Sequence, residues 1–430
     1  MGATRFCAFA VLAAGLAAPA AAQPIVVPDS GDTAWVLVAS ALVLLMTIPG
    51  LALFYGGLVR ARNVLSVVMH CFVMVCTISL LWAVIGYSLV FGEGNQWLGG
   101  TGNAFLASLS DLRSGTTLPE SAFALFQMTF AVITPALVIG AFVERIRFGW
   151  VVAFSLIWTM FVYIPVARSI WGGGWLSSLG ALDFAGGIVV HTTAGIAALV
   201  IAMRLGARRG FNKSLLPPHS PTLTMVGAGL LWFGWYGFNG GSALSASGDA
   251  ASAILNTHMA ACAAALVWIM LERAKIGKPT SIGIVTGAVA GLATVTPAAG
   301  YVGLMGAIVL GLLGGIVCFF AVQLVKQNWK VDDSLDVFAV HGVGGMLGSI
   351  FFPLFMSQSL GGIGFGDGQD LPGQLGAQAL GVGLVAAWTA LVTWLICVVS
   401  SVFLPMRVDE EAEHDGLDLS SHGERGWELD

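Results

Sequence analysis

Apolar residues run through most of the chain in long stretches, and short polar breaks separate these stretches. The pattern predicts eleven helices, which begin near residues 33, 64, 121, 148, 185, 222, 251, 280, 301, 334 and 374. A helix needs about 20 predominantly apolar residues to cross the hydrocarbon layer of a membrane. The pattern therefore predicts an all-α, polytopic membrane protein with 11 transmembrane helices.

The composition agrees with this interpretation. Of the 430 residues, 57% are hydrophobic and only 10% are charged, and the mean hydropathy is +0.88. A water-soluble domain cannot bury so much apolar surface. The formal net charge of −5 decides little, because the location of the charges matters more than their sum. Since no soluble domain is large enough to carry separate chemistry, we expect the function to lie within the membrane.

Lysine and arginine lie mostly in alternate loops between the predicted helices. With the amino terminus outside, the predicted cytoplasmic segments hold all of the 18 basic residues except Arg5, Arg113 and Arg168. Basic residues gather on the cytoplasmic side of membrane proteins. We therefore expect a periplasmic amino terminus, a transmembrane domain over residues 23–404 and an acidic cytoplasmic tail over residues 405–430. The expected location is the bacterial inner membrane.

Residues 1–22 resemble a cleavable signal peptide. Arg5 precedes an apolar stretch, and three alanines ending at Ala22 precede Gln23. We expect cleavage after Ala22, and a retained first helix is the alternative. The six cysteines show no paired or metal-like spacing, and we interpret them as packing residues.

Two histidines lie inside apolar runs, each of them eight residues after an aspartate. The pairs are Asp183 with His191 and Asp333 with His341, and they are 150 residues apart. An ionisable side chain within a membrane helix is costly and indicates a functional site. Each histidine is the best candidate partner of the other.

The equal spacing also predicts an internal repeat of five plus five helices around a central pore. His191 falls on the fifth predicted helix and His341 on the tenth. Because five is an odd number, the two halves must run in opposite senses, as in many transporters with inverted repeats. The substrate path of such transporters lies between the halves near the midplane, so we expect the histidines to face each other there.

Aromatic and glycine-rich segments form a second set of candidates. They are FQMTF (Phe126–Phe130), IWGGGW (Ile170–Trp175) and LWFGWYGFNGGS (Leu231–Ser242). Aromatic faces attract cations by about 0.5–2 kcal/mol, and a hydroxyl can accept a hydrogen bond from an ammonium group. For any single aromatic residue, packing against lipid is an equally good interpretation. Glycine-rich stretches usually indicate close helix packing.

Together with further motifs, these segments resemble the ammonium transporter (Amt/MEP/Rh) family, on its bacterial Amt side. The similarity extends from the first predicted helix to the tail. It includes GLALFYGGLVRARNVLS (Gly50–Ser66), GAFVERIRF (Gly140–Phe148), GALDFAGGIVVH (Gly180–His191), GWYGFNGGSA (Gly234–Ala243), VDDSLDVFAVHGVGG (Val331–Gly345) and GLDLSSHGE (Gly416–Glu424).

The resemblance implies roles for particular residues in an ammonium transporter that is not an enzyme and needs no cofactor or metal. An outer recruitment site for ammonium would be formed by Trp171, Phe126, Phe130 and Ser242. Asp183 would lie near that site in a structural and electrostatic role. Phe130 and Phe238 would form a gate of two stacked rings. His191 and His341 would line the pore and share a hydrogen bond.

The resemblance also implies an assembly and a regulator. The chain would form a homotrimer with one pore per subunit, and a PII-type signal protein would close the pore from the cytoplasmic side. An ammonium sensor that acts through such a protein is the alternative function. A gas channel of the Rh type is a further alternative. A membrane enzyme with the two histidines as metal ligands is disfavoured, because a third ligand is missing.

Three residues depart from the pattern expected of the family. His70 stands where we expect an uncharged polar residue, and we interpret it as a packing residue. Arg168 lies three residues before Trp171 and should weaken cation recruitment unless it points away or pairs with a carboxylate. Tyr236 stands where many relatives have phenylalanine, and we expect no effect from it.

Overall fold

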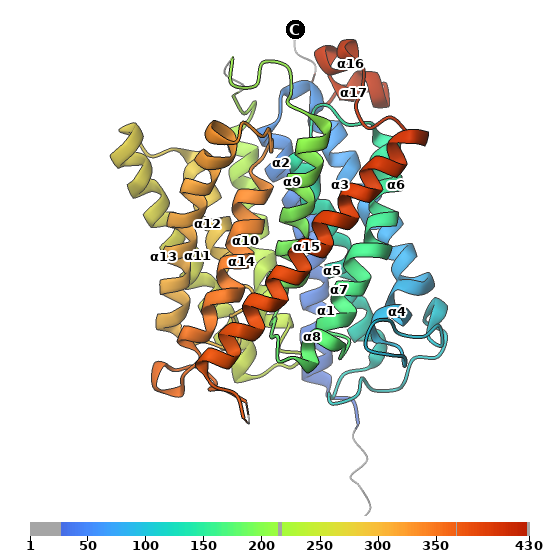
Figure 1. The fold of residues 1–430 in the computed structure, drawn as a ribbon, viewed down its shortest axis with the longest axis vertical. Helices are drawn as coiled ribbons and strands as arrows, with labels where there is room; N and C mark the ends of the chain where they lie inside the picture. The colour runs from blue at the N-terminus through green and yellow to red at the C-terminus, as the bar shows by residue number, and fades with distance from the viewer. Residues whose placement is uncertain (1–26, 214–216, 367, 428–430) are drawn as a thin grey trace, which may run out of the picture.

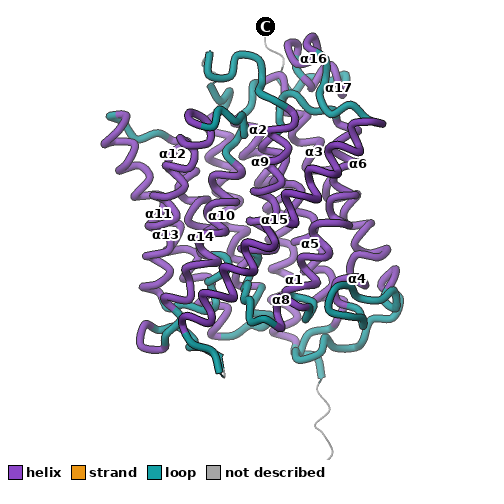
Figure 2. Tube along the Cα trace, viewed as in Figure 1, coloured by secondary structure: helices purple, strands orange, loops and turns teal. Residues whose placement is uncertain are grey.

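We describe a computed structural model of the chain, which covers residues 27–213, 217–366 and 368–427. The expected signal peptide at residues 1–22 lies outside the described residues. Within the described ranges the regular structure is helical, apart from two isolated β-bridges (Figure 2). The prediction of an all-α protein is therefore confirmed.

The first half of the bundle contains five long helical segments, most of them divided by tighter or wider turns. Each is long and apolar enough to cross a membrane. They are Ser30–Leu58 (α1 Ser30–Leu45, α2 Ala52–Leu58), Ala61–Phe91 (α3 Val64–Leu81, α4 Tyr87–Phe91), Glu120–Ala141 (α5 Glu120–Val138), Phe148–Ser178 (α6 Phe148–Trp158, α7 Ile164–Ile170, α8 Trp175–Ser178) and Gly187–Leu205 (η7 Gly187–Thr192, α9 Thr193–Leu205).

The second half begins with α10 and ends with α15. Its helices are α10 (Pro221–Gly241), α11 (Gly248–Ile276), α12 (Ser281–Val295), α13 (Leu304–Gln323), η9 with α14 (Phe338–Gly342, Val343–Phe351) and α15 (Leu371–Phe403). Over the whole described part of the chain, nine segments are long and apolar enough to span a membrane. α12 is shorter, with 15 residues. α10 has 21 residues but is rich in glycine and polar aromatic residues.

The long helices lie side by side in a single bundle, which α15 crosses obliquely (Figure 1). Two short tail helices, α16 (Glu410–Asp415) and α17 (Leu417–His422), lie at the end of the bundle where α15 finishes. We call this the tail end. α1 begins at the opposite end (Figure 1).

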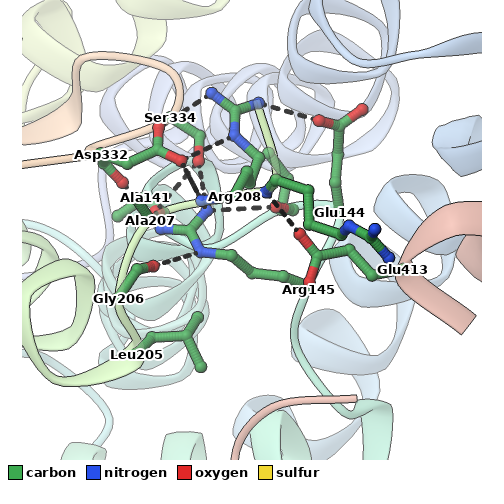
Figure 3. A network of polar contacts seen from close by, with 12 residues as sticks. Ala141, Glu144, Arg145, Leu205, Gly206, Ala207, Arg208, Asp332, Ser334 and Glu413 are labelled. Atoms are coloured by element: carbon green, nitrogen blue, oxygen red, sulfur yellow. Dashed lines mark hydrogen bonds and ion pairs between the residues drawn. The ribbon is translucent and has the colours of Figure 1, made fainter. Parts of the chain in front are cut away.

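A network of charged side chains joins the loops at the tail end (Figure 3). Arg145 is fully buried and donates to Gly206 O (3.0 Å), Asp332 O (2.7 Å) and Ser334 Oγ (2.6 Å). Arg208 pairs with Asp332 at 2.9 Å and with Glu144 at 2.8 Å. Burial acts to raise the pKa of the Glu144 carboxyl, but Arg208 and Arg60 outweigh it and hold that pKa below its usual value.

The same network anchors the tail. Glu413 is buried and pairs with Arg407 at 2.7 Å, and it accepts a hydrogen bond from the backbone N–H of Arg209 at 2.9 Å. The carboxylate of Asp418 accepts the N–H of Ser66 at 2.8 Å, near the start of α3. The tail is therefore held against the segment at the start of α3 and the loop that follows α9.

Candidate functional site

The structure brings His191 and His341 together in the middle of the bundle. Their Nδ1 atoms are 3.2 Å apart, which is hydrogen-bond distance, and their rings are nearly parallel with centroids 5.2 Å apart. The two residues are 1% and 4% exposed. Each lies in a π-turn at the start of its helix, His191 in η7 and His341 in η9. The pairing expected from the sequence is thus present in the geometry.

The two aspartates position these turns through backbone hydrogen bonds. Both oxygens of Asp183 accept N–H groups at 2.7–2.9 Å, from residues 186 and 187 on Oδ1 and from 188 and 189 on Oδ2. Burial raises the pKa of Asp183 to about 6, although these N–H groups favour the charged form. Asp333 accepts one N–H, from Phe338 at 2.7 Å. The carboxylates therefore act as caps of η7 and η9 and not as ligands of the histidines.

Glycines four residues after each histidine allow the two helices to cross closely. A Cβ on Gly195 would lie 2.2 Å from Gly342 Cα, and a Cβ on Gly345 would lie 2.5 Å from His191 Cβ. Any larger residue at either position would push the helices apart. Each of the two helical segments thus contributes a histidine and a contact glycine.

Aromatic rings cover the histidines on the side away from the tail end. The rings of Phe130 and Phe238 lie 4.3 Å apart at 30°, and Phe238 is 6.1 Å from His191. Trp171 stands edge-on to Phe130 at 5.6 Å, and its Nε1 donates to Asp183 O at 2.8 Å. The Ser242 hydroxyl donates to Phe238 O at 2.8 Å, which leaves its lone pairs available as acceptors.

A cavity of about 540 Å³ opens on the far side of these rings, and we call it the aromatic cavity. Phe130, Trp171, Asp183 and Ser242 are among its lining residues. Phe126, which the resemblance placed in the same site, does not line this cavity. It is fully buried and lies behind Phe130, with 5.0 Å between the ring centroids.

Between the aromatic rings and the tail end the path narrows to a constriction. Its space is about 10 Å³, the lower limit for a single water molecule. The walls are the two histidines and apolar side chains, among them Phe54, Leu231, Trp235 and Phe238. On the other side of His341 lies a tail-end cavity of about 230 Å³, whose wall includes Tyr55, Lys326 and Asp336.

The three residues that depart from the family pattern lie outside this path. Arg168 turns away from the aromatic cavity and donates to the carbonyls of Val90 (2.9 Å), Gly92 (3.0 Å) and Asn95 (2.7 Å). His70 is buried, with its ring 5.4 Å from that of Phe148, as expected of a packing residue. The Tyr236 hydroxyl lies 2.8 Å from His258 Nδ1.

Sequence reasoning did not single out several residues of the path. Trp235 stacks on His191 at 5.5 Å and 22°, and its Nε1 donates to Thr296 Oγ1 at 2.9 Å. The sequence could have indicated Trp235, because it lies three residues before Phe238 and therefore on the same face of the helix. Gln127 and Asp249 line the aromatic cavity.

These features define a class of protein: a helical membrane protein with two cavities separated by a narrow, mostly apolar constriction that carries a histidine pair. Comparison with known families then identifies the chain. Residues 34–427 match the model of the Ammonium Transporter Family, and the chain belongs to that family.

Individual relatives agree. The chain is 44% identical over 405 residues to the ammonium transporter of Bacillus subtilis, which covers 93% of this chain and 98% of the relative. Saccharomyces cerevisiae Mep2 superposes with a TM-score of 0.83 at 34% identity, covering 89% of this chain and 88% of that one. A structure described as a sensor Amt protein gives a TM-score of 0.85 at 29% identity, with coverages of 91% and 98%.

Proposed function

We propose that the protein takes ammonium from outside the cell at the aromatic cavity, removes a proton and conducts ammonia past His191 and His341 into the cytoplasm. One observation carries this proposal. The constriction between the two cavities has a space of only about 10 Å³, and its lining residues are aliphatic or aromatic apart from the two histidines. A neutral molecule the size of ammonia can pass such a segment by local rearrangement, whereas a hydrated cation cannot keep its water there.

Recruitment is assigned to the rings and hydroxyl that face the aromatic cavity. Trp171 and Phe130 present aromatic surface to a cation, worth about 0.5–2 kcal/mol and more where water is excluded. Ser242 Oγ offers an acceptor for one N–H of ammonium. Asp183 contributes negative charge and, through its carbonyl, holds the indole of Trp171. Phe126 supports Phe130 from behind.

The stacked rings of Phe130 and Phe238 act as the gate between the aromatic cavity and the constriction. Both are essentially inaccessible in this structure, at 1% and 0% exposure. Opening therefore requires at least one ring to rotate.

The energetics favour loss of a proton at this point. Moving a bare ion into a hydrocarbon-like pore costs tens of kcal/mol by idealised Born arithmetic, although water and polar groups reduce the figure. Deprotonating a lysine-like amine at pH 7 costs only about 5 kcal/mol, from roughly 3.4 pKa units at 1.36 kcal/mol each. Ammonium is a slightly stronger acid, so its cost is smaller. The histidine pair then offers both a donor and an acceptor to ammonia.

Selectivity follows from the same comparison. A potassium ion is also attracted by the aromatic rings, but it has no proton to lose and meets the full barrier. The released proton either returns to the outside or follows the histidine pair, which titrates as one unit. The first case makes transport electroneutral and the second makes it electrogenic, and a current measurement distinguishes them.

We infer that α10 and α12 cross the membrane together with the nine apolar segments, giving eleven spans and an inverted repeat of five plus five. The basic loops then place the tail end in the cytoplasm of a bacterial inner membrane. The family resemblance supports a homotrimer and a PII-type partner on the cytoplasmic face. A pull-down from membranes after an ammonium pulse should recover that partner, and its absence would count against the assignment.

The histidine role is tested with His191→Leu and His341→Leu in proteoliposomes. We expect each variant to lose most of its methylammonium uptake, because the constriction no longer offers polar atoms to ammonia, and potassium exclusion is measured beside it. His258→Leu is the matched control, since His258 lies on α11 outside the constriction and should leave both properties unchanged. Normal methylammonium uptake and normal potassium exclusion in both pore variants would refute the role.

A second candidate function is an ammonium sensor that signals through a PII-type protein. The structural similarity to the sensor Amt protein supports this second candidate. A host strain that lacks its own ammonium transporters separates the two functions. Rescue of its growth on low ammonium supports transport, whereas binding of ammonium without rescue supports sensing.

A further inference from the structure

Three charged side chains line the aromatic cavity, and two of them are engaged by neighbours. Arg113 pairs with Glu120 at 3.7 Å and lies over the ring of Phe123 at 4.6 Å. Asp183 is 4% exposed and uses both oxygens to accept backbone N–H groups. The third is Asp249, an exposed residue in the first turn of α11. In the described ranges it makes neither a hydrogen bond nor an ion pair through its carboxylate.

We propose that Asp249 is an electrostatic steering residue, which concentrates small monovalent cations at the mouth of the aromatic cavity before they reach Trp171 and Ser242. This inference rests on the proposed function of the cavity as the entrance for ammonium. Asp249 acts on capture alone and takes no part in proton removal or conduction.

The physical basis is the field of an unpaired carboxylate beside a cavity with apolar walls. Charges that line a cleft focus their field through the cleft opening and raise the local concentration of counter-ions. The positive charge of Arg113 opposes this field, but Glu120 compensates it locally. Asp32 lines an adjoining hollow together with Arg113, and its charge has the same sign as that of Asp249.

Asp32 differs from Asp249 because its carboxylate is bound to the protein. It accepts the N–H of Ala246 at 2.7 Å and the hydroxyl of Thr117. Its substitution would disturb the loop before α11. Asp249 has no such contacts, so its charge can be removed with little structural consequence. The stabilising effect of an acidic residue in the first turn of a helix is small and can be followed separately.

The experiment compares Asp249→Asn with wild type in proteoliposomes at about 10 mM and about 1 M ionic strength. The Debye length falls from about 30 Å to about 3 Å between these conditions. At low ionic strength we expect the half-saturating ammonium concentration to rise about two- to fivefold, as a single charge several ångströms from the cation would produce in water. The maximal transport rate should stay the same. At high ionic strength the variant and the wild type should agree.

Two further variants sharpen the test. Asp249→Glu keeps the charge and should behave as wild type. Glu93→Gln removes an exposed carboxylate that lines neither the aromatic cavity nor the adjoining hollow, and it should change nothing. Potassium should compete with ammonium less effectively in Asp249→Asn, because the same field attracts both cations.

Three results would overturn the proposal. They are an unchanged half-saturating concentration at low ionic strength, a change that persists at high ionic strength, and a change in the maximal transport rate without a change in the half-saturating concentration. A lower thermal stability of Asp249→Asn accompanied by salt-independent kinetics would assign the residue to the helix alone. A wild-type protein that takes up neither ammonium nor methylammonium would instead refute the proposed function, and the steering role with it.

Discussion

At the scale of single residues, Arg168 shows how a charged side chain near the proposed cation entrance can be structural. Its guanidinium donates to three backbone carbonyls between residues 90 and 95, and it is 7% exposed. These carbonyls partly neutralise its positive charge, and the side chain does not line the aromatic cavity. The weakened recruitment that the sequence suggested is therefore not expected.

We predict that Arg168→Lys is a stability defect. A lysine ammonium cannot match the planar fork of donors, so at least one carbonyl is left without a partner. The free energy of unfolding should fall by about 1–3 kcal/mol, which is the cost of leaving a buried polar group without a partner. The thermal unfolding midpoint in detergent should fall, while the half-saturating ammonium concentration should stay the same. A changed ammonium affinity with a normal midpoint would contradict this assignment.

Asp333 gives a prediction about pH at the same scale. Burial, assisted by the nearby charge of Asp336, raises the pKa of Asp333 to about 7, against about 3.9 in an unfolded chain. The pKa of Asp333 is thus higher in the folded state than in the unfolded state. The contribution of Asp333 to stability is therefore fully present below about pH 4 and is lost as the pH rises through 7. The neutral carboxyl is the form that suits the folded protein.

Asp333→Asn should therefore remove part of the pH dependence of stability. Asparagine stays uncharged and can still accept the N–H of Phe338. At pH 8 the variant should be more stable than wild type by up to about 2–4 kcal/mol, and at pH 4 the difference should vanish. Unfolding midpoints measured from pH 4 to pH 8 test this. Asp111→Asn, at an exposed carboxyl, is the control. Parallel curves for wild type and Asp333→Asn would exclude the effect.

At the scale of elements, the contact between η7–α9 and η9–α14 decides the geometry of the histidine pair. Gly345→Ala would bring the new Cβ within 2.5 Å of His191 Cβ and 2.8 Å of Gly187 O. We predict a destabilisation of about 1–3 kcal/mol, typical of overpacking, and a loss of most transport, because the imidazoles move apart. Unfolding midpoints and methylammonium uptake measure the two effects.

The control for this substitution is Gly383→Ala on α15, where a Cβ would meet nothing within 4 Å. Alanine favours the helix over glycine by up to about 1 kcal/mol. This control should therefore be neutral or slightly stabilising, with normal uptake. Equal behaviour of the two glycine variants would show that close approach of the helices is not required.

The elements also show what sequence could and could not predict. Long apolar runs identify helices well, because each span must satisfy its own backbone hydrogen bonds in lipid. The pairing of His191 with His341 followed from equal spacing to an aspartate. The π-turns at both histidines were not predictable, since they depend on capping by Asp183 and Asp333 and on interhelical glycine contacts. The direction of Arg168 depends on carbonyls more than 70 residues away.

At the scale of the whole molecule, the tail joins parts of the chain that are far apart in sequence. The sequence predicted an acidic tail over residues 405–430. In the structure Glu413 and Asp418 are buried at 2% and 1% exposure, and α16 and α17 pack on the tail end (Figure 1). These acidic residues bind arginines and backbone N–H groups, which links the tail helices to the start of α3 and to the loop after α9.

We predict that Glu413→Gln releases the tail without unfolding the bundle. The neutral amide cannot form the ion pair with Arg407, so one of the contacts that hold α16 weakens. Glu413 is buried and Arg407 is about one-third exposed. We therefore expect the free energy that holds the tail on the bundle to fall by about 1–2 kcal/mol. Trypsin should then cut the tail several times faster, at Arg407 or Arg425, while the unfolding midpoint of the spans stays within a few degrees.

Glu411→Gln, at an exposed carboxylate on the same short helix, should show the wild-type cleavage rate. If both variants are cut at the wild-type rate, the tail is held by Asp418 and the packing of α17 and not by the Glu413 pair.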